Sequence, residues 1–105
     1  MGAEGTGARK ERKLRKAFEA NPAGAEACLD LGKYYFLKEE FARAGEVYRQ
    51  GLEHNPDSVG ILLNLAVTRE AQGRCEDAKK LYLKVLEVDA NNQSAQERLE
   101  RLTSF

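Results

Sequence analysis

The sequence predicts an all-α fold of about six antiparallel helices arranged as stacked hairpins. Helix-forming residues dominate the chain, and only Pro22 and Pro56 interrupt them. Apolar residues recur at three- and four-residue spacing, which places them on one side of each helix. The pattern also recurs after 34 positions, since Leu31 matches Leu65 and Tyr48 matches Tyr82. Such a repeat is typical of hairpins that bury their apolar sides against their neighbours.

The repeat predicts how the chain is organised. Residues 25–58 form one complete unit, with helices over 25–37 and 41–54, and residues 59–92 form the next, with its second helix over 75–88. A backward shift aligns Leu14 with Tyr48 and Phe18 with Leu52, so residues 8–21 match the second half of a unit. A forward shift predicts a charged capping helix over residues 93–103. Residues 1–7 are expected to be a flexible leader before a domain spanning 8–105.

Small and helix-ending residues predict how the helices meet. The short segment 38–40 makes the helices of the first unit antiparallel neighbours, and Gly32 lets them approach closely. Asn55 precedes a proline and is therefore pushed out of the helical region. Gly73 supplies the turn of the second unit, because glycine adopts a left-handed conformation without steric cost. The interior of the first unit is expected to hold Cys28, Leu31, Tyr35, Phe41, Ala44, Val47, Tyr48 and Leu52, with Phe18 from the preceding helix.

The run Cys28-x-x-Leu31-Gly32-x-x-Tyr35, followed by Ala44-x-x-x-Tyr48 and Pro56, resembles the signature of the tetratricopeptide repeat. Cys28 stands where the family usually has an aromatic residue. The second unit departs further, because Arg69, Cys75 and Ala90 replace the expected tyrosine, aromatic residue and proline. The resemblance covers residues 10–103. It implies a right-handed superhelix and a protein-interaction function with an unspecified partner.

The resemblance also implies where a partner would bind, because the first helices of the units line a concave groove in this family. The corresponding positions are Glu26, Leu29, Asp30, Lys33, Leu37, Leu63, Asn64, Val67, Glu70, Glu97, Arg98 and Arg101. Leu29, Leu63 and Val67 have two interpretations. They form an apolar strip that accepts an extended peptide or an amphipathic helix, or they pack between neighbouring hairpins.

One subgroup of the family holds the carboxylate of chaperone tails with a clamp of Lys and Asn residues. Asn64 and Arg98 match that clamp, whereas Leu29, Lys33 and Ser94 stand where it has Lys, Asn and Lys. The sequence therefore favours a partly hydrophobic partner over a chaperone tail.

Charge and the incomplete leading unit leave two alternative functions open. The seventeen basic and seventeen acidic residues cancel, but residues 1–24 carry a net charge of +3. The basic run of residues 9–16 is either a solvated helix face or a weak site for nucleic acid or an anionic surface. The uncovered helix over residues 8–21 also predicts the end of a longer repeat array, or self-association.

Sequence patterns of catalysis and cofactor binding are absent. Neither G-x-x-x-x-G-K-[ST] nor G-x-G-x-x-G occurs. His54 is the only histidine, and it is too far in sequence from Cys28 and Cys75 to suggest a metal site. Both cysteines are expected to be buried free thiols in a reducing cytosol. No apolar run approaches the roughly 18 residues that span a bilayer. We therefore expect a cytoplasmic, non-enzymatic adaptor or scaffold without cofactor or metal.

Overall fold

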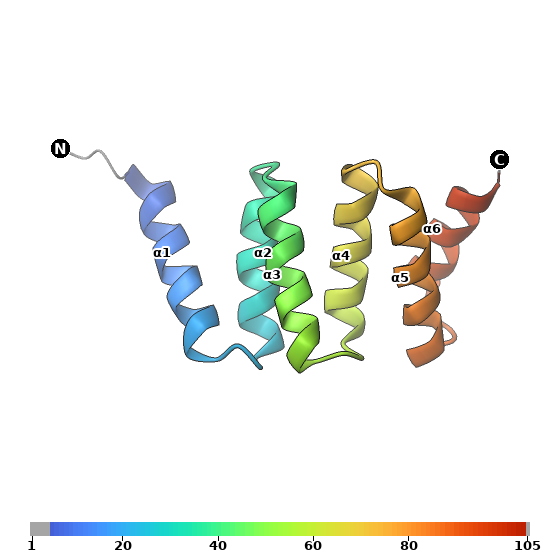
Figure 1. The fold of residues 1–105 in the computed structure, drawn as a ribbon, viewed down its shortest axis with the longest axis horizontal. Helices are drawn as coiled ribbons and strands as arrows, with labels where there is room; N and C mark the ends of the chain where they lie inside the picture. The colour runs from blue at the N-terminus through green and yellow to red at the C-terminus, as the bar shows by residue number, and fades with distance from the viewer. Residues whose placement is uncertain (1–4, 105) are drawn as a thin grey trace.

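The computed structural model describes residues 5–104, which form six α-helices in a row (Figure 1). They are α1 (Gly5–Ala20), α2 (Ala25–Leu37), α3 (Phe41–His54), α4 (Val59–Ala71), α5 (Cys75–Val88) and α6 (Gln93–Thr103). Consecutive helices are antiparallel, and the row measures 52 × 27 × 18 Å. The predicted all-α fold of six helices is confirmed.

The first helix begins earlier than the sequence predicted. Residues 5–7, assigned above to a flexible leader, are the first residues of α1. Residues 1–4 lie outside the described residues. The first turns of α1 contact α2, because the Tyr34 hydroxyl donates a hydrogen bond of 2.8 Å to the Gly7 carbonyl.

The turns and caps repeat with the units. Gly73 has a φ of 76°, as predicted, and Glu39 takes the equivalent position in the first unit with a φ of 60°. The left-handed conformation costs a non-glycine residue about 1–2 kcal/mol of conformational free energy. The sequence analysis did not predict this conformation at Glu39. Ser58 and Asn92, also 34 positions apart, cap α4 and α6 by accepting hydrogen bonds from the backbone amides of the third residue after each.

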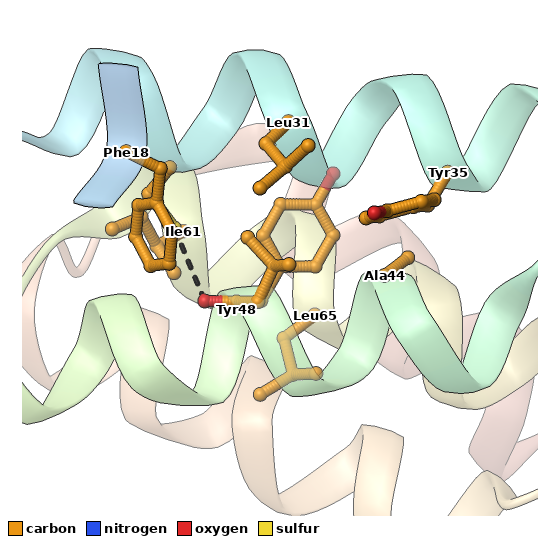
Figure 2. Close-up of a cluster of buried hydrophobic side chains, with 9 residues drawn as sticks. Phe18, Leu31, Tyr35, Ala44, Tyr48, Ile61 and Leu65 are labelled. Atoms are coloured by element: carbon orange, nitrogen blue, oxygen red, sulfur yellow. Dashed lines mark hydrogen bonds between the residues drawn. The ribbon is translucent and has the colours of Figure 1, made fainter. Parts of the chain in front are cut away.

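Two apolar clusters hold the hairpins together. The first joins α1 to α4 through Phe18, Cys28, Leu31, Tyr35, Ala44, Val47, Tyr48, Ile61 and Leu65. The second joins α4 to α6 through Leu62, Ala66, Ala78, Tyr82, Val85 and Ala95. Figure 2 shows Leu31 and Tyr35 pointing from α2 toward Ala44 and Tyr48 of α3. Leu52 and Leu81 are half-buried and pack against both clusters, so the solenoid has one continuous interior.

Two interior positions of the prediction need correction. Phe41 and Leu52 are half-buried rather than fully enclosed. Phe41 is the first residue of α3, and its ring packs against that of Phe36 with the centroids 5.1 Å apart. Residues at helix ends have fewer neighbours than those in the middle, so periodicity alone overestimates their burial.

Close approach of α2 and α3 depends on two glycines. A Cβ atom at Gly32 would lie 2.8 Å from Cδ1 of Tyr48 and closer still to two other atoms of that ring. A Cβ atom at Gly51 would lie 3.2 Å from Cβ of Cys28 and collide with the Cys28 sulfur. The contact predicted at Gly32 is therefore confirmed, and Gly51 makes a second one that the sequence reasoning missed.

The two cysteines lie in different environments. Cys28 is fully buried and its thiol donates a hydrogen bond of 3.4 Å to the Val47 carbonyl. Cys75 is exposed, so its predicted burial was wrong. It is the first residue of α5, directly after the Gly73 turn, where the helix face is not yet covered by its neighbours.

We expect this difference to appear in thiol reactivity. Burial raises the pKa of the Cys28 thiol to about 11, so little of the reactive thiolate exists near pH 7. Alkylation of the folded protein should modify Cys75 within minutes and Cys28 only at the rate of unfolding. Mass spectrometry of peptides from iodoacetamide-treated protein measures both rates, with a urea-unfolded sample as the control. Equal rates in the folded protein would contradict the burial of Cys28.

Candidate protein-interaction surface

The groove positions implied by the family resemblance lie on the first helices α2, α4 and α6, and α2 contacts α4 directly. We call this surface the first-helix face. Glu26, Asp30, Lys33, Leu37, Glu97 and Arg101 are exposed on it, and Leu29, Leu63, Asn64, Val67, Glu70 and Arg98 are half-buried. The face therefore presents charged side chains around a partly covered apolar floor.

The three apolar residues of this face differ in what they contact. Leu29 packs against the first cluster and Leu63 against the second. A Cβ atom at Gly60 of α4 would lie 3.4 Å from Cδ1 of Leu29, so Leu29 also fills the space between α2 and α4. Among the described residues, Val67 is half-buried yet belongs to neither cluster. Leu29 and Leu63 thus serve helix packing, and Val67 is the apolar residue available on α4.

Asn64 and Arg98, the two matches to the carboxylate clamp, have partners within the protein. The Asn64 amide donates a hydrogen bond of 2.7 Å to the Gly60 carbonyl of its own helix. A guanidinium nitrogen of Arg98 lies 3.5 Å from a Glu70 carboxylate oxygen. The buried Tyr82 hydroxyl donates to the same carboxylate oxygen. Burial, and then the hydrogen bond to Glu70, raise the pKa of Tyr82.

The Glu70–Tyr82–Arg98 cluster connects α4, α5 and α6 and fixes the end of the first-helix face. Sequence reasoning placed Glu70 and Arg98 on this face but missed their link through Tyr82. The tyrosine was assigned to the interior from its register, and a repeat pattern carries no information about which carboxylate its hydroxyl reaches.

At the other end of the face, α1 and α2 enclose a hollow of about 380 Å³. Its lining consists of Lys10, Leu14, Asp30, Lys33, Tyr34, Leu37 and Lys38. The structure therefore brings three predicted positions, Asp30, Lys33 and Leu37, next to α1 residues that the sequence reasoning left out. The 34-residue shift held the missing signal, since it aligns Leu14 with the buried Tyr48.

Several polar contacts hold α1 against α2. The Tyr35 hydroxyl donates a hydrogen bond of 2.6 Å to a Glu11 carboxylate oxygen and accepts one from Arg15. A guanidinium nitrogen of Arg43 on α3 lies 3.4 Å from the same Glu11 oxygen. Burial, followed by the Glu11 hydrogen bond, raises the pKa of Tyr35. One cation of the basic run, Arg15, therefore serves the structure, while Lys10 and Lys13 are exposed.

Two of the lysines that line the hollow, Lys10 and Lys38, lie near the ring of Tyr34. The Lys38 ammonium lies 5.2 Å from the centroid of the Tyr34 ring, and the Lys10 ammonium lies 6.0 Å from it. The Lys38 ammonium also donates a hydrogen bond of 3.4 Å to the Tyr34 hydroxyl, and this contact raises the pKa of Lys38. These ammonium groups give this end of the face a positive field.

The part of the chain that the structure describes, residues 5–104, contains no helix that is both long enough and apolar enough to cross a membrane.

The sequence and the fold were compared with those of known proteins. The sequence model of the tetratricopeptide repeat family matches residues 35–102. Tetratricopeptide repeat protein 8 of Caenorhabditis elegans is 35% identical over 65 residues, which are 62% of this chain and 13% of that protein. The protein ycf37 of Pyropia yezoensis is 38% identical over 68 residues, covering 65% of this chain and 38% of the relative. The chain thus spans well under two thirds of these relatives.

Solved structures extend the similarity to nearly the whole fold. The first tetratricopeptide repeat domain of Spaghetti (RPAP3), bound to the HSP90 peptide SRMEEVD, superposes with a TM-score of 0.84. The match covers 96% of this chain and 80% of that one at 24% sequence identity. The human RPAP3 domain determined by NMR matches equally well.

Proposed function

Because the chain belongs to the tetratricopeptide repeat family, we propose that it is a protein-interaction module whose first-helix face binds a peptide or a helix of a partner protein. The observation that carries this proposal is Val67, a half-buried apolar residue outside both clusters. Charged side chains of α2 and α6, such as Lys33 and Glu97, are exposed on the same first-helix face. An apolar anchor point with a polar rim is the usual composition of a peptide-binding groove.

The comparison with RPAP3 supports the same general function, because that domain binds a peptide. The contacts of this chain favour a different mode of recognition from a carboxylate clamp. Arg98 is paired with Glu70, and the Asn64 amide donates to its own helix. A terminal carboxylate would have to displace these partners and would meet Leu29 where a clamp has a cation. We therefore propose an internal segment with an apolar side chain as the ligand.

A substitution at Val67 tests this function. Replacing Val67 with arginine puts a charge at the apolar anchor point and leaves both clusters intact. We expect Val67→Arg to lose at least one partner that the wild-type protein captures from cell extract, with a decrease in affinity of about tenfold or more. Quantitative mass spectrometry of the captured proteins measures the loss.

The matched control is Leu83→Arg on α5, where the leucine is 51% exposed and lies outside the first-helix face. Circular dichroism melting should show both variants folded. If Val67→Arg and Leu83→Arg retain the same partners as the wild-type protein, the first-helix face is not the binding surface.

A further inference from the structure

Within residues 5–104, no helix covers one side of α1, whereas the equivalent side of α3 is buried. In the repeat register α1 takes the position of a second helix, like α3. Its Lys10, Lys13, Leu14 and Ala17 correspond to Ala44, Val47, Tyr48 and Gly51, all buried in α3. In α1 the same positions are exposed, apart from the half-buried Leu14. Figure 1 shows α1 at the edge of the row, with α2 as its neighbour on one side.

Three hollows follow this uncovered side of α1 and α2. The hollow of about 380 Å³ described above shares Lys10 and Leu14 with one of about 550 Å³. A third, of about 410 Å³, contains Ala17 and Asp30 and reaches Gly24 at the other end of α2. Together they form a groove along the 13 residues of α2, about 20 Å long. We call it the α1–α2 groove. It has the length of a short helix.

The groove is apolar at its floor and basic at its rim. Leu14, Tyr34 and Leu37 contribute apolar surface, and Leu37 is 73% exposed. The cations that line it are Arg9, Lys10, Lys13, Lys33 and Lys38, and the anions are Glu26 and Asp30. The lining therefore carries a net charge of +3. Lysine stems add apolar surface while their ammonium groups stay in water. An acidic ligand complements this rim.

We propose that the α1–α2 groove binds an amphipathic helix of a partner protein, with an apolar stripe on Leu14 and Leu37 and glutamate or aspartate residues facing the lysines. The bound helix would occupy the position of a first helix relative to α1, as α2 does relative to α3. This inference goes beyond the proposed function because it adds α1, although the groove shares Glu26, Asp30, Lys33 and Leu37 of α2 with the first-helix face.

A second copy of the chain fits the groove less well. The helix in register for that position is α6, which carries equal numbers of acidic and basic residues and so has no charge complementary to the rim. The same register aligns Glu100 of α6 with Gly32. Gly32 is the point of closest approach in the α2–α3 hairpin, where even a Cβ atom would collide with Tyr48. The charge and the packing therefore both favour a partner with an acidic helix.

A synthetic peptide tests the proposal. The probe is an acetylated, fluorescein-labelled peptide of about 16 residues, with Leu and Ala on one helical side and Glu at the other positions. One control peptide has Lys in place of every Glu, and another has the same composition in scrambled order. We expect fluorescence anisotropy to detect binding of the Glu peptide alone, weakening between about 50 and 500 mM salt as the charges are screened.

Variants of the chain locate the binding. We expect Leu37→Glu, and separately the double change Lys10→Glu with Lys13→Glu, to weaken peptide binding about tenfold. Leu83→Glu is the matched control for Leu37→Glu, and Lys16→Glu makes a single charge reversal on α1 outside the groove. Both variants should bind like the wild-type protein. Val67→Arg should also bind the Glu peptide normally. Loss of partner binding on the first-helix face can therefore be distinguished from loss of peptide binding in the α1–α2 groove.

Three results would overturn the proposal. The first is equal binding of the Glu, Lys and scrambled peptides. The second is an equal loss of affinity in Lys16→Glu and in the groove variants, which would indicate attraction to the basic helix in general. The third is a wild-type dimer in sedimentation that Leu37→Glu dissociates while the peptide fails to bind, because the occupant would then be a second copy.

Discussion

Replacing Leu31 with alanine is expected to lower the free energy of unfolding by about 2–5 kcal/mol. Leu31 is fully buried in the first cluster and points from α2 toward the ring of Tyr48 (Figure 2). Truncation removes apolar contacts and leaves a cavity, because the close-packed neighbours relax into it only in part. Domains of this size are stable by only about 5–15 kcal/mol. Urea unfolding followed by circular dichroism measures the change.

Leu37→Ala is the matched control, since it makes the same chemical change on the same helix at a side chain that is 73% exposed. Its expected effect is within about 0.5 kcal/mol of zero. Similar losses in the two variants would contradict the role of burial, because alanine has a higher helix propensity than leucine and Leu37 is exposed. A loss below about 1 kcal/mol in Leu31→Ala would mean that the first cluster is not tightly packed.

The second large effect is expected at Gly32. Gly32→Ala should destabilise the protein by about 1–3 kcal/mol, although alanine alone would favour the helix by about 1 kcal/mol. The added methyl group would collide with the ring of Tyr48, which is 1% exposed and enclosed by the first cluster. Relief of that collision requires α2 and α3 to separate. Thermal and urea unfolding of the variant measure the cost.

Gly60→Ala separates the gain in helix propensity from the steric collision. Gly60 lies within α4, where the added atom would be 3.4 Å from Leu29, an ordinary van der Waals distance. We expect this variant to equal or exceed the wild-type stability, by up to about 1 kcal/mol. If both glycine variants gained stability, the close approach of α2 and α3 would not require glycine, and the strain argued for Gly32 would be absent.

The architecture could be predicted because its signals are local and repeated. Leu31 and Leu65, at the same place in successive units, are both buried. Gly73 has the left-handed conformation that its place between two helices predicted. Each of these inferences needs only a periodicity or a residue's own conformational preference. The 34-residue spacing then sets the number of hairpins and the register in which they stack.

Where the prediction was wrong or incomplete, the deciding contact came from another helix. Near its start, α1 accepts a hydrogen bond from Tyr34, which is 27 positions away from the Gly7 carbonyl that it reaches. Cys75 has the register of an interior residue but lies at a helix end that its neighbours do not cover. Glu70 was recognised as a surface residue, yet its link to Tyr82 and Arg98 requires three helices to be in place.

The repeat pattern alone was sufficient to establish the helices, their pairing and the family, because burial in a solenoid follows from position within the unit. The surfaces open to partners were decided by the assembled helices. Leu37 is exposed while Leu29 and Leu63 are partly covered, although all three lie on first helices. The α1–α2 groove likewise exists because, within the described part of the chain, α2 packs along one side of α1 and no helix packs along the other (Figure 1). The exposure of a side chain depends on whether another helix packs against it. A repeat pattern predicts where such a helix would lie, but it does not say whether that helix comes from this chain or from a partner.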